Sequence, residues 1–362
     1  MRIALFINRL HSGGAERVMT SLANAWAAAG HEITLLTIAN EPVFYPLATG
    51  VRVRALDLCG ESGTTVNALL LNARRISGLR KQLLAANPDI FISFMHCCNV
   101  VAILGSLRTG VPTIVCEHND PSQCRAGGAW STLRVLTYPL ADAVTFLTEN
   151  VLQRWRWLGN ASLMPNPVVV EKTASGIPRN WPQAPRRILA VGRLTAQKGF
   201  DRLISAFAQI SQAYPEWSLT ILGEGADRPQ LERRIRELDL ENRVNMPGTV
   251  TNPFDWMAEA DFLVMSSRYE GFPCVVGEAM ACGLPVVSFD CDSGPRDIIR
   301  HGVDGLLVEP NDVDALAGAM GRLMADDKQR ESMARRAPEV LDRFSLSTVL
   351  HRWDRLFARV RA

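Results

Sequence analysis

The sequence lacks the features that mark several large classes of protein. Its 39 lysines and arginines nearly balance its 37 acidic residues, so the net charge is only +2 and the chain as a whole gives no sign of binding nucleic acid. No run reaches the roughly 18 uncharged apolar residues needed to cross a bilayer, and the apolar run at residues 3–7 is too short for a signal peptide. We therefore expect a cytoplasmic protein that at most contacts the inner face of the cytoplasmic membrane.

Two sequence motifs are also missing. The eight cysteines include no Cys-x-x-Cys pair and several lie in apolar runs, so we expect reduced and buried thiols. No Gly-x-Gly-x-x-Gly sequence follows an apolar run, which disfavours a nicotinamide-dependent oxidoreductase. A length of 362 residues, of which 47% are apolar, instead predicts about two domains that each bury a core.

The sequence does contain a repeated pattern of short apolar runs, polar loops and amphipathic helices. Runs rich in Val, Ile and Leu without strict alternation predict parallel strands that are covered on both faces. The first set of predicted strands comprises residues 3–7, 32–38, 51–56, 89–94, 112–117 and 143–148. The second set comprises residues 187–192, 217–223, 243–246, 261–266, 285–289 and 305–308.

A segment with five prolines and little periodicity, residues 164–186, separates the two sets and is the linker candidate. The sequence thus predicts an α/β fold with two Rossmann-like doubly wound domains, residues 1–168 and 169–344, that face each other across a cleft. A final helix, residues 345–362, needs a surface for the apolar face around Trp353. Ligands of open α/β sheets bind beyond the carboxyl ends of the strands, so the loops there should carry the chemistry.

Two glutamates separated by seven residues are the most specific feature of these loops. Pro273 is placed as the first-turn proline of a helix, so that Glu270 lies in the preceding loop and Glu278 one to two turns inside. Two carboxylates accept hydrogen bonds and do not donate them, so a pair aimed into one cleft indicates a polyhydroxyl ligand such as a sugar or a ribose. The alternative is a pair of solvated charges on a helix face.

Two loops of the first set hold further candidates. Gly13 and Gly14 follow the first strand, where backbone N–H groups can approach a phosphate or a sugar closely; a simple tight turn is the alternative. His118 follows the predicted strand at 112–117, and a neutral imidazole there could bond a sugar hydroxyl or assist a leaving phosphate. His96 competes for that role, and a purely structural histidine stays open. Arg125, Arg134 and Trp130 could add to an acceptor groove.

The loop after residues 187–192 offers two cations. Arg193 follows the strand directly and Lys198 begins the next helix, which is the arrangement of a diphosphate clamp. Gly192 beside them and Gly223 after the next strand indicate close approach of the backbone, although a solvated pair of cations is the alternative. The loop containing Val250 could present backbone hydrogen-bond donors and acceptors to a flat nucleotide base.

A possible metal motif and a basic helix complete the candidates. Asp290 and Asp292 form an Asp-x-Asp pattern, but the pattern is common by chance and two cations could neutralise a diphosphate without a metal. Residues 66–86 predict an amphipathic helix, either an interfacial helix that meets anionic lipid or a lipid diphosphate, or an ordinary surface helix. Its basic residues are Arg74, Arg75, Arg80 and Lys81.

Together these residues resemble glycosyltransferase family 4, retaining enzymes of the GT-B fold, over most of the chain. The sequences GGAERV, EHNDP and SFDC are most similar to bacterial members that build surface glycans or lipid-linked oligosaccharides. The resemblance implies that the final helix returns to the first domain. It implies catalytic roles for Glu270, His118, Arg193 and Lys198, with backbone amides near Gly294 assisting. It implies donor binding by Gly13, Gly14, Gly192, Gly223, Val250, Gly271, Phe272, Pro273 and Glu278.

The reaction that the resemblance implies is transfer of a hexose or N-acetylhexosamine from a nucleotide sugar, with a UDP-sugar as the family expectation. The acceptor would be a glycan or a polyprenyl-diphosphate-linked glycan. Configuration would be retained through a front-face displacement in which the leaving phosphate takes the acceptor's proton, with no metal or other cofactor required. A UDP-sugar epimerase on the same fold and a non-catalytic nucleotide-sugar-binding protein are the alternatives.

Overall fold

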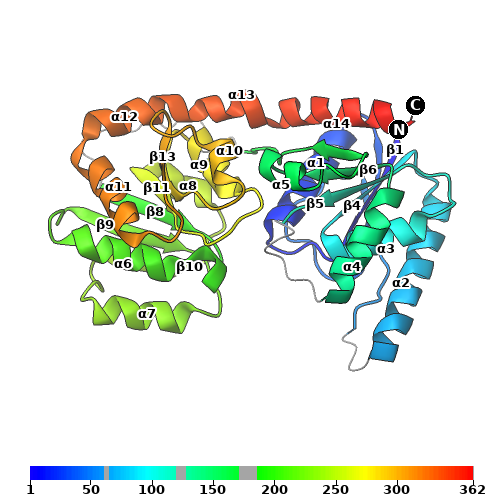
Figure 1. Ribbon diagram of the computed structural model, residues 1–362, viewed down its shortest axis with the longest axis horizontal. Helices are drawn as coiled ribbons and strands as arrows, with labels where there is room; N and C mark the ends of the chain where they lie inside the picture. The colour runs from blue at the N-terminus through cyan, green and yellow to red at the C-terminus, as the bar shows by residue number, and fades with distance from the viewer. Residues whose placement is uncertain (61–64, 120–127, 171–185, 362) are drawn as a thin grey trace. The chain divides into compact units, whose positions relative to one another are not determined.

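The computed structural model describes residues 1–60, 65–119, 128–170 and 186–361 (Figure 1). These residues form two compact units, one of Met1–Pro167 with Leu346–Ala362 and the other of Val168–Ser345. Each unit contains its own parallel sheet with helices between successive strands. The predicted α/β fold with two doubly wound units is therefore confirmed. Most of the predicted linker, residues 171–185, lies outside the described residues.

The described strands of the first unit form one parallel sheet in the order β3-β2-β1-β4-β5-β6-β7. They are β1 (Arg2–Ile7), β2 (Glu32–Thr37), β3 (Val51–Ala55), β4 (Ile90–Phe94), β5 (Thr113–Glu117), β6 (Ala143–Phe146) and β7 (Ala161–Leu163). The central strands β4 and β5 are buried along their whole length, as expected for a sheet covered on both faces. The edge strand β7 was not predicted, because it has three half-buried residues and a polar centre, Ser162.

Helices cover both faces of this first sheet. They are α1 (Gly14–Ala28), α2 (Thr65–Ala86), α3 (His96–Ser106), α4 (Gly128–Thr137), η1 (Tyr138–Leu140), α5 (Glu149–Arg154) and α14 (Leu346–Arg361). Side chains of α2 and α3 share one core with β1, β2 and β4. The final helix α14 buries Trp353 and Phe357 against Trp26 of α1, with ring centroids 5.6 Å and 5.5 Å from that indole. The apolar face around Trp353 thus has its partner within the first unit.

The described strands of the second unit form a parallel sheet in the order β10-β9-β8-β11-β12-β13. They are β8 (Arg186–Val191), β9 (Trp217–Leu222), β10 (Val244–Gly248), β11 (Phe262–Met265), β12 (Val286–Phe289) and β13 (Gly305–Val308). A large apolar core, which includes Phe207, Leu219 and Met320, joins this sheet to the helices beside it.

Helices also accompany each strand of the second unit. They are η2 (Ala196–Lys198), α6 (Phe200–Ser211), α7 (Arg228–Glu237), α8 (Pro253–Glu259), α9 (Cys274–Ala281), α10 (Pro295–Ile298), α11 (Val313–Ala325), α12 (Asp327–Arg336), η3 (Ala337–Glu339) and α13 (Val340–Phe344). Figure 1 shows α6 and α7 along one side of this sheet and α9 and α10 along the other. The second unit is therefore also a three-layer arrangement.

In both units the strand order reverses next to the first strand. β1 lies between β2 and β4, and β8 lies between β9 and β11. At such a switch point the loops after the two central strands diverge to opposite faces and leave room for a ligand at the carboxyl ends. In the second unit these are the loops that follow β8 and β11, which carry Lys198 and Glu270.

The expectation that the cysteines are buried needs correction. All seven cysteines among the described residues are free thiols, but Cys59 is exposed and Cys97, Cys274 and Cys282 are only half-buried. Cys59 lies four residues beyond the end of β3, the edge strand of the sheet. Burial raises the pKa of the Cys98 thiol beyond its ordinary range, so that thiol is protonated at neutral pH.

Backbone crowding between adjacent strands explains one glycine and yields a prediction. Gly223 has a φ of +134°, and a Cβ atom there would lie 2.0 Å from the carbonyl oxygen of Gly192. We expect Gly223→Ala to lower the free energy of unfolding by about 1–3 kcal/mol, in the range of a strained backbone position. The measurement is denaturant unfolding. Gly318→Ala is the matched control, since a Cβ atom at that helical glycine meets nothing within 4 Å; equal losses in both variants would contradict the prediction.

Candidate functional site

The clearest polar site of the second unit joins the loops after β8 and β11. The ammonium of Lys198 lies 2.6 Å from Oε1 of Glu270, and the hydroxyl of Ser267 donates to the same oxygen at 2.6 Å. The hydroxyl of Ser293 donates to the backbone oxygen of Glu270 at 2.5 Å. Glu270 is only 7% exposed, and its carboxylate is held in position by Lys198 and Ser267 while Ser293 holds its backbone oxygen.

The two loops are fixed to each other by contacts outside the ion pair. Gly199 has a φ of +64°, and a Cβ atom there would lie 2.2 Å from the carbonyl oxygen of Ser266. The guanidinium of Arg268 binds both carboxylate oxygens of Asp201 at 3.0 Å and 2.7 Å. The Gln197 side-chain amide donates to the backbone oxygen of Tyr269 at 3.1 Å. Lys198 and Glu270 are therefore positioned by the backbone on both sides.

The second predicted cation of this loop has different surroundings. Arg193 is exposed, and no carboxylate of the described residues pairs with it. The Lys198 stem packs 3.2 Å from the position that a Cβ atom on Gly192 would occupy, which explains the glycine between the strand and the cations. One exposed cation and one ion-paired cation thus lie at the end of β8.

The second glutamate is placed on a neighbouring helix. Glu278 lies in α9 and is 6% exposed, and Pro273 immediately precedes the first residue of that helix. Phe272 packs its ring 5.3 Å from that of Phe344, so its side chain belongs to the core of the second unit. Gly271 is half-buried in the same loop. Glu270 thus lies in the loop four residues before α9, and Glu278 is the fifth residue of that helix.

Other predicted loops are engaged by protein contacts. The Gly223 N–H donates to the Gly248 carbonyl at 2.8 Å, so this close approach involves protein backbone. Val250 is half-buried two residues beyond the end of β10. The Gly294 N–H donates to a carboxylate oxygen of Asp297 at 3.3 Å. Asp290 is held by both guanidinium donors of Arg296, at 2.9 Å and 2.8 Å. An Arg-bound Asp290 is a poor candidate for a metal ligand.

In the first unit the glycine loop adjoins the N-terminus of α1. Gly13 caps the helix in an extended conformation, and Gly14 is its first residue. A Cβ atom on Gly13 would lie 2.0 Å from a carboxylate oxygen of Glu16, whose side chain folds back over the end of the helix. Sequence reasoning missed this carboxylate, which occupies the position where the helix end would favour an anion.

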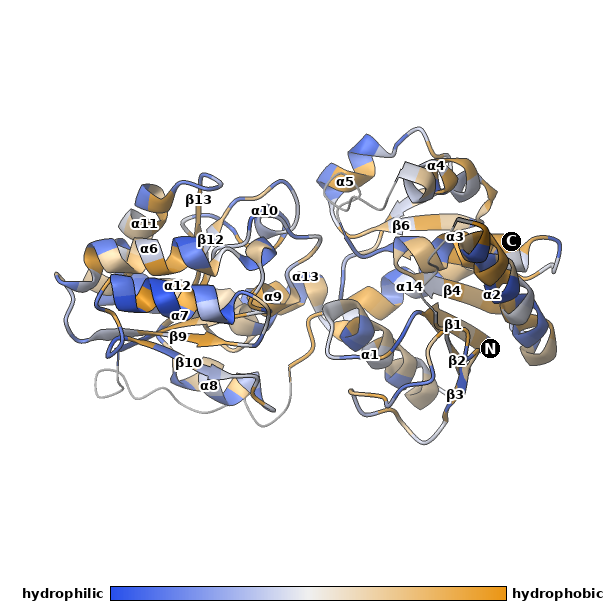
Figure 2. Ribbon diagram, turned by 90° about the horizontal axis from the view of Figure 1, so that it is seen from below, coloured by the Kyte–Doolittle hydropathy of each residue, from blue (hydrophilic) through white to orange (hydrophobic). Residues whose placement is uncertain are grey.

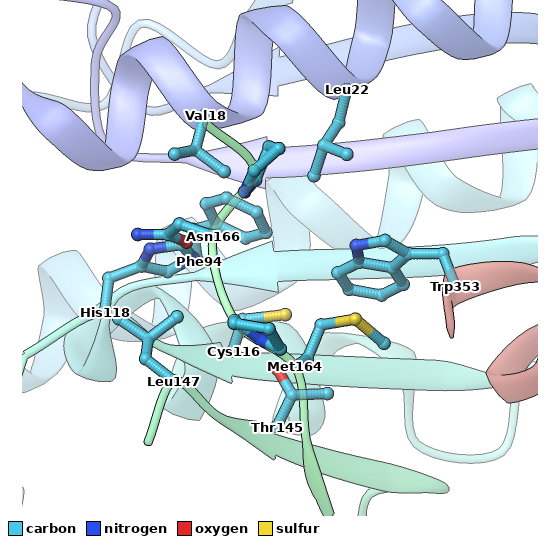
Figure 3. A pocket seen from close by; sticks show the side chains of 12 residues that line it. Val18, Leu22, Phe94, Cys116, His118, Thr145, Leu147, Met164, Asn166 and Trp353 are labelled. Carbon is cyan, nitrogen blue, oxygen red and sulfur yellow. The ribbon is translucent and has the colours of Figure 1, made fainter. Parts of the chain in front are cut away.

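His118 follows β5 and lies deep in the first unit. Its ring stacks on Phe94 with centroids 3.9 Å apart, and side chains from α1 and α14 complete the surroundings (Figure 3). Nδ1 has no hydrogen-bond partner among the described residues. The adjoining cavity of about 10 Å³ has room for about one water molecule. Burial lowers the pKa of His118 to about 3, so the imidazole is neutral at physiological pH.

The residue before His118 belongs to a buried polar network that the sequence did not reveal. Glu117 is 2% exposed and accepts a short hydrogen bond from the hydroxyl of Tyr138. The amide of Asn99 donates to the same hydroxyl at 3.1 Å and to the Cys116 carbonyl at 3.0 Å. Arg134 lies 3.6 Å from the Glu117 carboxylate. Arg134 is thus buried, which corrects its expected place in an acceptor groove; Arg125 of the same prediction lies outside the described residues.

Two remaining candidates differ in accessibility. His96 is the first residue of α3 and is half-buried, and burial is the main cause of its lowered pKa. On α2, Arg75 and Arg80 are half-buried and donate to the backbone oxygens of Leu58 at 3.1 Å and Leu107 at 2.6 Å. The other basic residues of this helix, Arg74 and Lys81, are exposed. Two of the four basic residues of α2 therefore bond this helix to the segments that contain Leu58 and Leu107.

Comparison with known proteins agrees with this arrangement. Solved structures with this architecture of two doubly wound units are GT-B glycosyltransferases, so the chain has the GT-B fold. Residues 13–171 match the family described as glycosyl transferase 4-like domain, and residues 173–340 match the family described as glycosyl transferases group 1. The chain belongs to glycosyltransferase family 4 and is therefore a glycosyltransferase. None of the helices in the described ranges is both long enough and apolar enough to span a membrane.

Several named proteins are similar to this chain. An N-acetylgalactosaminyltransferase from Campylobacter jejuni, which acts on a GalNAc-containing undecaprenol diphosphate, is 28% identical over 100% of this chain and 99% of its own. An exopolysaccharide phosphotransferase from Streptomyces coelicolor is 31% identical over 96% of this chain, which spans 39% of that protein. Among solved structures, sucrose-phosphate synthase from Thermosynechococcus elongatus has a TM-score of 0.84 at 21% identity, covering 99% and 98% of the two chains. Anabaena HepE with UDP and glucose has a TM-score of 0.79 at 20% identity, covering 98% and 99%.

The buried imidazole makes stability depend on pH. The folded-state pKa of His118, about 3, lies below its ordinary value of 6.5, so the unfolded chain binds the extra proton as the pH falls below 6.5. The stabilising contribution is complete above pH 6.5 and decreases towards pH 3. Between pH 7.5 and pH 5 we expect this residue to account for a loss of about 2 kcal/mol of unfolding free energy.

Denaturant unfolding of the wild type and of His118→Gln at pH 7.5 and pH 5 measures the effect. Between these two pH values the variant should lose about 2 kcal/mol less unfolding free energy than the wild type. His351→Gln, which removes an exposed histidine of α14, should keep the wild-type dependence. Identical pH dependence in His118→Gln and the wild type would show that the imidazole titrates normally.

Proposed function

We propose that this chain is a retaining glycosyltransferase that moves a hexose or N-acetylhexosamine from a UDP-sugar to a glycan or polyprenyl-diphosphate-linked acceptor. The observation that carries the proposal is the buried arrangement of Lys198, Glu270 and Ser267 at the switch point of the second unit. It combines a cation, a hydrogen-bond acceptor and a hydroxyl at the carboxyl ends of parallel strands. Such a set suits a ligand that carries both phosphate and sugar hydroxyls.

The two cations of the loop after β8 would act on the leaving group. As the bond between the anomeric carbon and the phosphate oxygen breaks, negative charge develops on the diphosphate, and Arg193 and Lys198 would stabilise it. The acceptor oxygen forms the new bond to the anomeric carbon on the same face. The leaving phosphate oxygen takes the acceptor's proton, so no protein carboxylate need act as nucleophile. With two cations at the diphosphate, we propose that no metal is required.

The glutamates would then hold the two ends of the donor. Glu270 accepts hydrogen bonds from the hydroxyls of the transferred sugar, and Glu278 accepts those of the ribose. A bound diphosphate would compete with Glu270 for the Lys198 ammonium, which now lies 2.6 Å from that carboxylate. Donor binding would therefore leave Glu270 with a vacant acceptor oxygen for a sugar hydroxyl. The roles of Gly13, Gly14 and His118 in this scheme stay predictions.

The names of similar proteins support the choice of substrates. HepE has been solved with UDP and with glucose, which supports a UDP-sugar donor. The Campylobacter jejuni relative acts on an undecaprenol-diphosphate-linked glycan, and an Erwinia amylovora relative acts in amylovoran biosynthesis. These names support a place in cell-surface polysaccharide or lipid-linked glycan synthesis. We further propose that the chain acts at the inner face of the cytoplasmic membrane. No observation favours an epimerase or a non-catalytic binding protein.

Kinetics of two variants test the proposed site. Lys198→Ala should lower kcat with a UDP-sugar at least a hundredfold, because it removes charge stabilisation from the developing diphosphate. Glu270→Ala should cause a comparable loss, because the transferred sugar loses its hydroxyl acceptor. Nuclear magnetic resonance of the wild-type product should show the anomeric configuration of the donor. An inverted product would refute retention, and a fully active Glu270→Ala would refute the site assignment.

The controls separate chemistry from stability and from metal dependence. Glu339→Gln weakens a distant ion network of the same unit, with Arg300 2.8 Å from the carboxylate, and should leave turnover unchanged. Unfolding of each variant shows whether the loss of one ion-pair partner has destabilised the fold. A chelator of divalent cations should leave wild-type turnover unchanged; loss of activity that Mg²⁺ restores would refute metal independence without refuting the transfer reaction.

We also propose that α2 contacts the membrane surface. Its later leucines, Leu79 and Leu83, are fully buried, whereas Leu69 is 68% and Leu70 is 56% exposed. Figure 2 shows both hydrophilic and hydrophobic segments along this helix. Exposed leucines beside the exposed Arg74 are the combination that binds the interface of an anionic bilayer. The helix would thereby bring the protein to a lipid-linked acceptor.

Vesicle binding tests this contact. Leu69→Asp with Leu70→Asp should weaken binding to phosphatidylglycerol vesicles at least tenfold, since it removes apolar area and adds two negative charges. Leu136→Asp with Leu140→Asp is the matched control, because these two leucines are 65% and 56% exposed but lie on α4 and η1. Co-sedimentation measures all variants. Unchanged binding of the α2 variant would place the membrane contact elsewhere.

A further inference from the structure

A groove lies in the first unit between the edge strand β7 and the final helix α14, away from the loops discussed above. Its volume is about 340 Å³. Ser162, Leu163 and Met164 line it from the strand side, and the helix contributes Leu356 and a row of arginines. Since β7 is the last strand of its sheet, no further described strand covers this side. The groove is therefore open to a ligand.

The arginine row consists of Arg352, Arg355 and Arg359, which project from one face of α14 because they are three and four residues apart. Among the described residues no carboxylate lies within ion-pair distance of any of the three. Within the described ranges, a hydrogen bond of 2.5 Å from Arg359 to the hydroxyl of Ser162 ties the row to the strand side of the groove. Arg268 differs from these three, because its guanidinium lies 2.7 Å from the carboxylate of Asp201.

Ordinary helix stability does not account for this row. Like charges at spacings of three and four residues repel each other and destabilise a helix. The helix dipole favours cations only in the last turn, which explains Arg359 but not Arg352 and Arg355. The three charges also exceed the net charge of the whole chain, +2. An external anion would remove the repulsion.

The floor of the groove narrows the class of anion. Met164 and Leu356 are buried and Leu163 is half-buried, so the base is apolar while guanidinium groups stand at the rim. Guanidinium groups bind phosphate oxygens in a bidentate manner, and the Ser162 hydroxyl adds a further polar group. A ligand that matches both parts carries a phosphate on an apolar body.

We propose that the groove between β7 and α14 binds a phosphate group attached to an apolar chain, with Arg352, Arg355 and Arg359 as its phosphate ligands. This site is separate from the proposed donor site and does not depend on the proposed transfer reaction. It also differs from the contact proposed for α2, since it holds one phosphate in a defined groove. The phosphate therefore belongs to a lipid headgroup, and inorganic phosphate serves as the probe that lacks an apolar body.

Binding of two probes tests the site. The wild type is titrated with monomeric dihexanoyl-phosphatidylglycerol and with inorganic phosphate, by calorimetry. Replacing the three arginines with glutamine should weaken binding of the phospholipid about a hundredfold, because each cation contributes a factor of about five. Replacing them with lysine keeps the charge but removes the planar guanidinium group, so we expect a smaller loss of phospholipid affinity than with glutamine.

A charge-matched variant controls for the loss of three positive charges. Arg233→Gln, Arg236→Gln and Lys328→Gln together change exposed residues of the second unit and should leave phospholipid binding unchanged. If the triple glutamine variant of α14 does not fold, Arg355→Gln alone should lower affinity about fivefold; Arg355 is chosen because its side chain is exposed.

The outcomes distinguish binding of a lipid headgroup from binding of phosphate alone. Phospholipid binding that depends on the arginines, with much weaker phosphate binding, identifies a lipid headgroup. Equally tight binding of both probes, with equal dependence on the arginines, would overturn the role of the apolar floor. If the α14 variants and the charge-matched variant bind both probes as the wild type does, the proposal is overturned. Because the readout is binding, a failure here would leave the transfer activity to be judged by the kinetics of the Lys198 and Glu270 variants.

Discussion

The second unit depends on the adjacency of two parallel strands, β8 and β11. Ile188 and Leu189 lie beside Phe262 and Leu263 in the sheet, so the loops that follow these strands must meet. That meeting places Lys198 against Glu270, although 71 residues separate them in the chain. A largely buried ion pair is tolerable only when further hydrogen bonds satisfy it. The hydroxyl of Ser267 and the crowded backbone at Gly199 supply that support.

In the first unit, the polar groups at the carboxyl ends of the strands have different partners. There the carboxylate of Glu117 is satisfied by Tyr138 and Arg134, and the next residue, His118, is held neutral against Phe94. The charged pair of the second unit suits a phosphate-bearing donor, whereas a neutral imidazole suits a hydroxyl. The two units thus share one topology but hold different polar groups at the carboxyl ends of their sheets. The second unit has the ion pair of Lys198 and Glu270, and the first has a neutral imidazole beside a buried carboxylate.

Two amphipathic helices of the first unit show how the same sequence pattern can have different outcomes. In α14 the apolar face is buried against Trp26 of α1, and what remains outside is a row of arginines over a groove. In α2 only the later turns reach the core, so Leu69 and Leu70 stay exposed. The periodicity of a helix predicts that it has an apolar face. Which turns of that face are covered depends on where neighbouring elements end.

The sequence by itself determined the parallel strands, the two units and the family, because buried strands and motifs such as Glu270 with Glu278 are local patterns. It also located the cations Arg193 and Lys198 after one strand. Only the tertiary structure decided that Lys198 pairs with Glu270, that Gly223 is needed for backbone packing, and that Arg134 is buried beside Glu117. Strand β7 was not predicted, because a half-buried edge strand of three residues is too short to show a periodic pattern. Contacts between residues far apart in the chain depend on strand order, and no local pattern encodes that order.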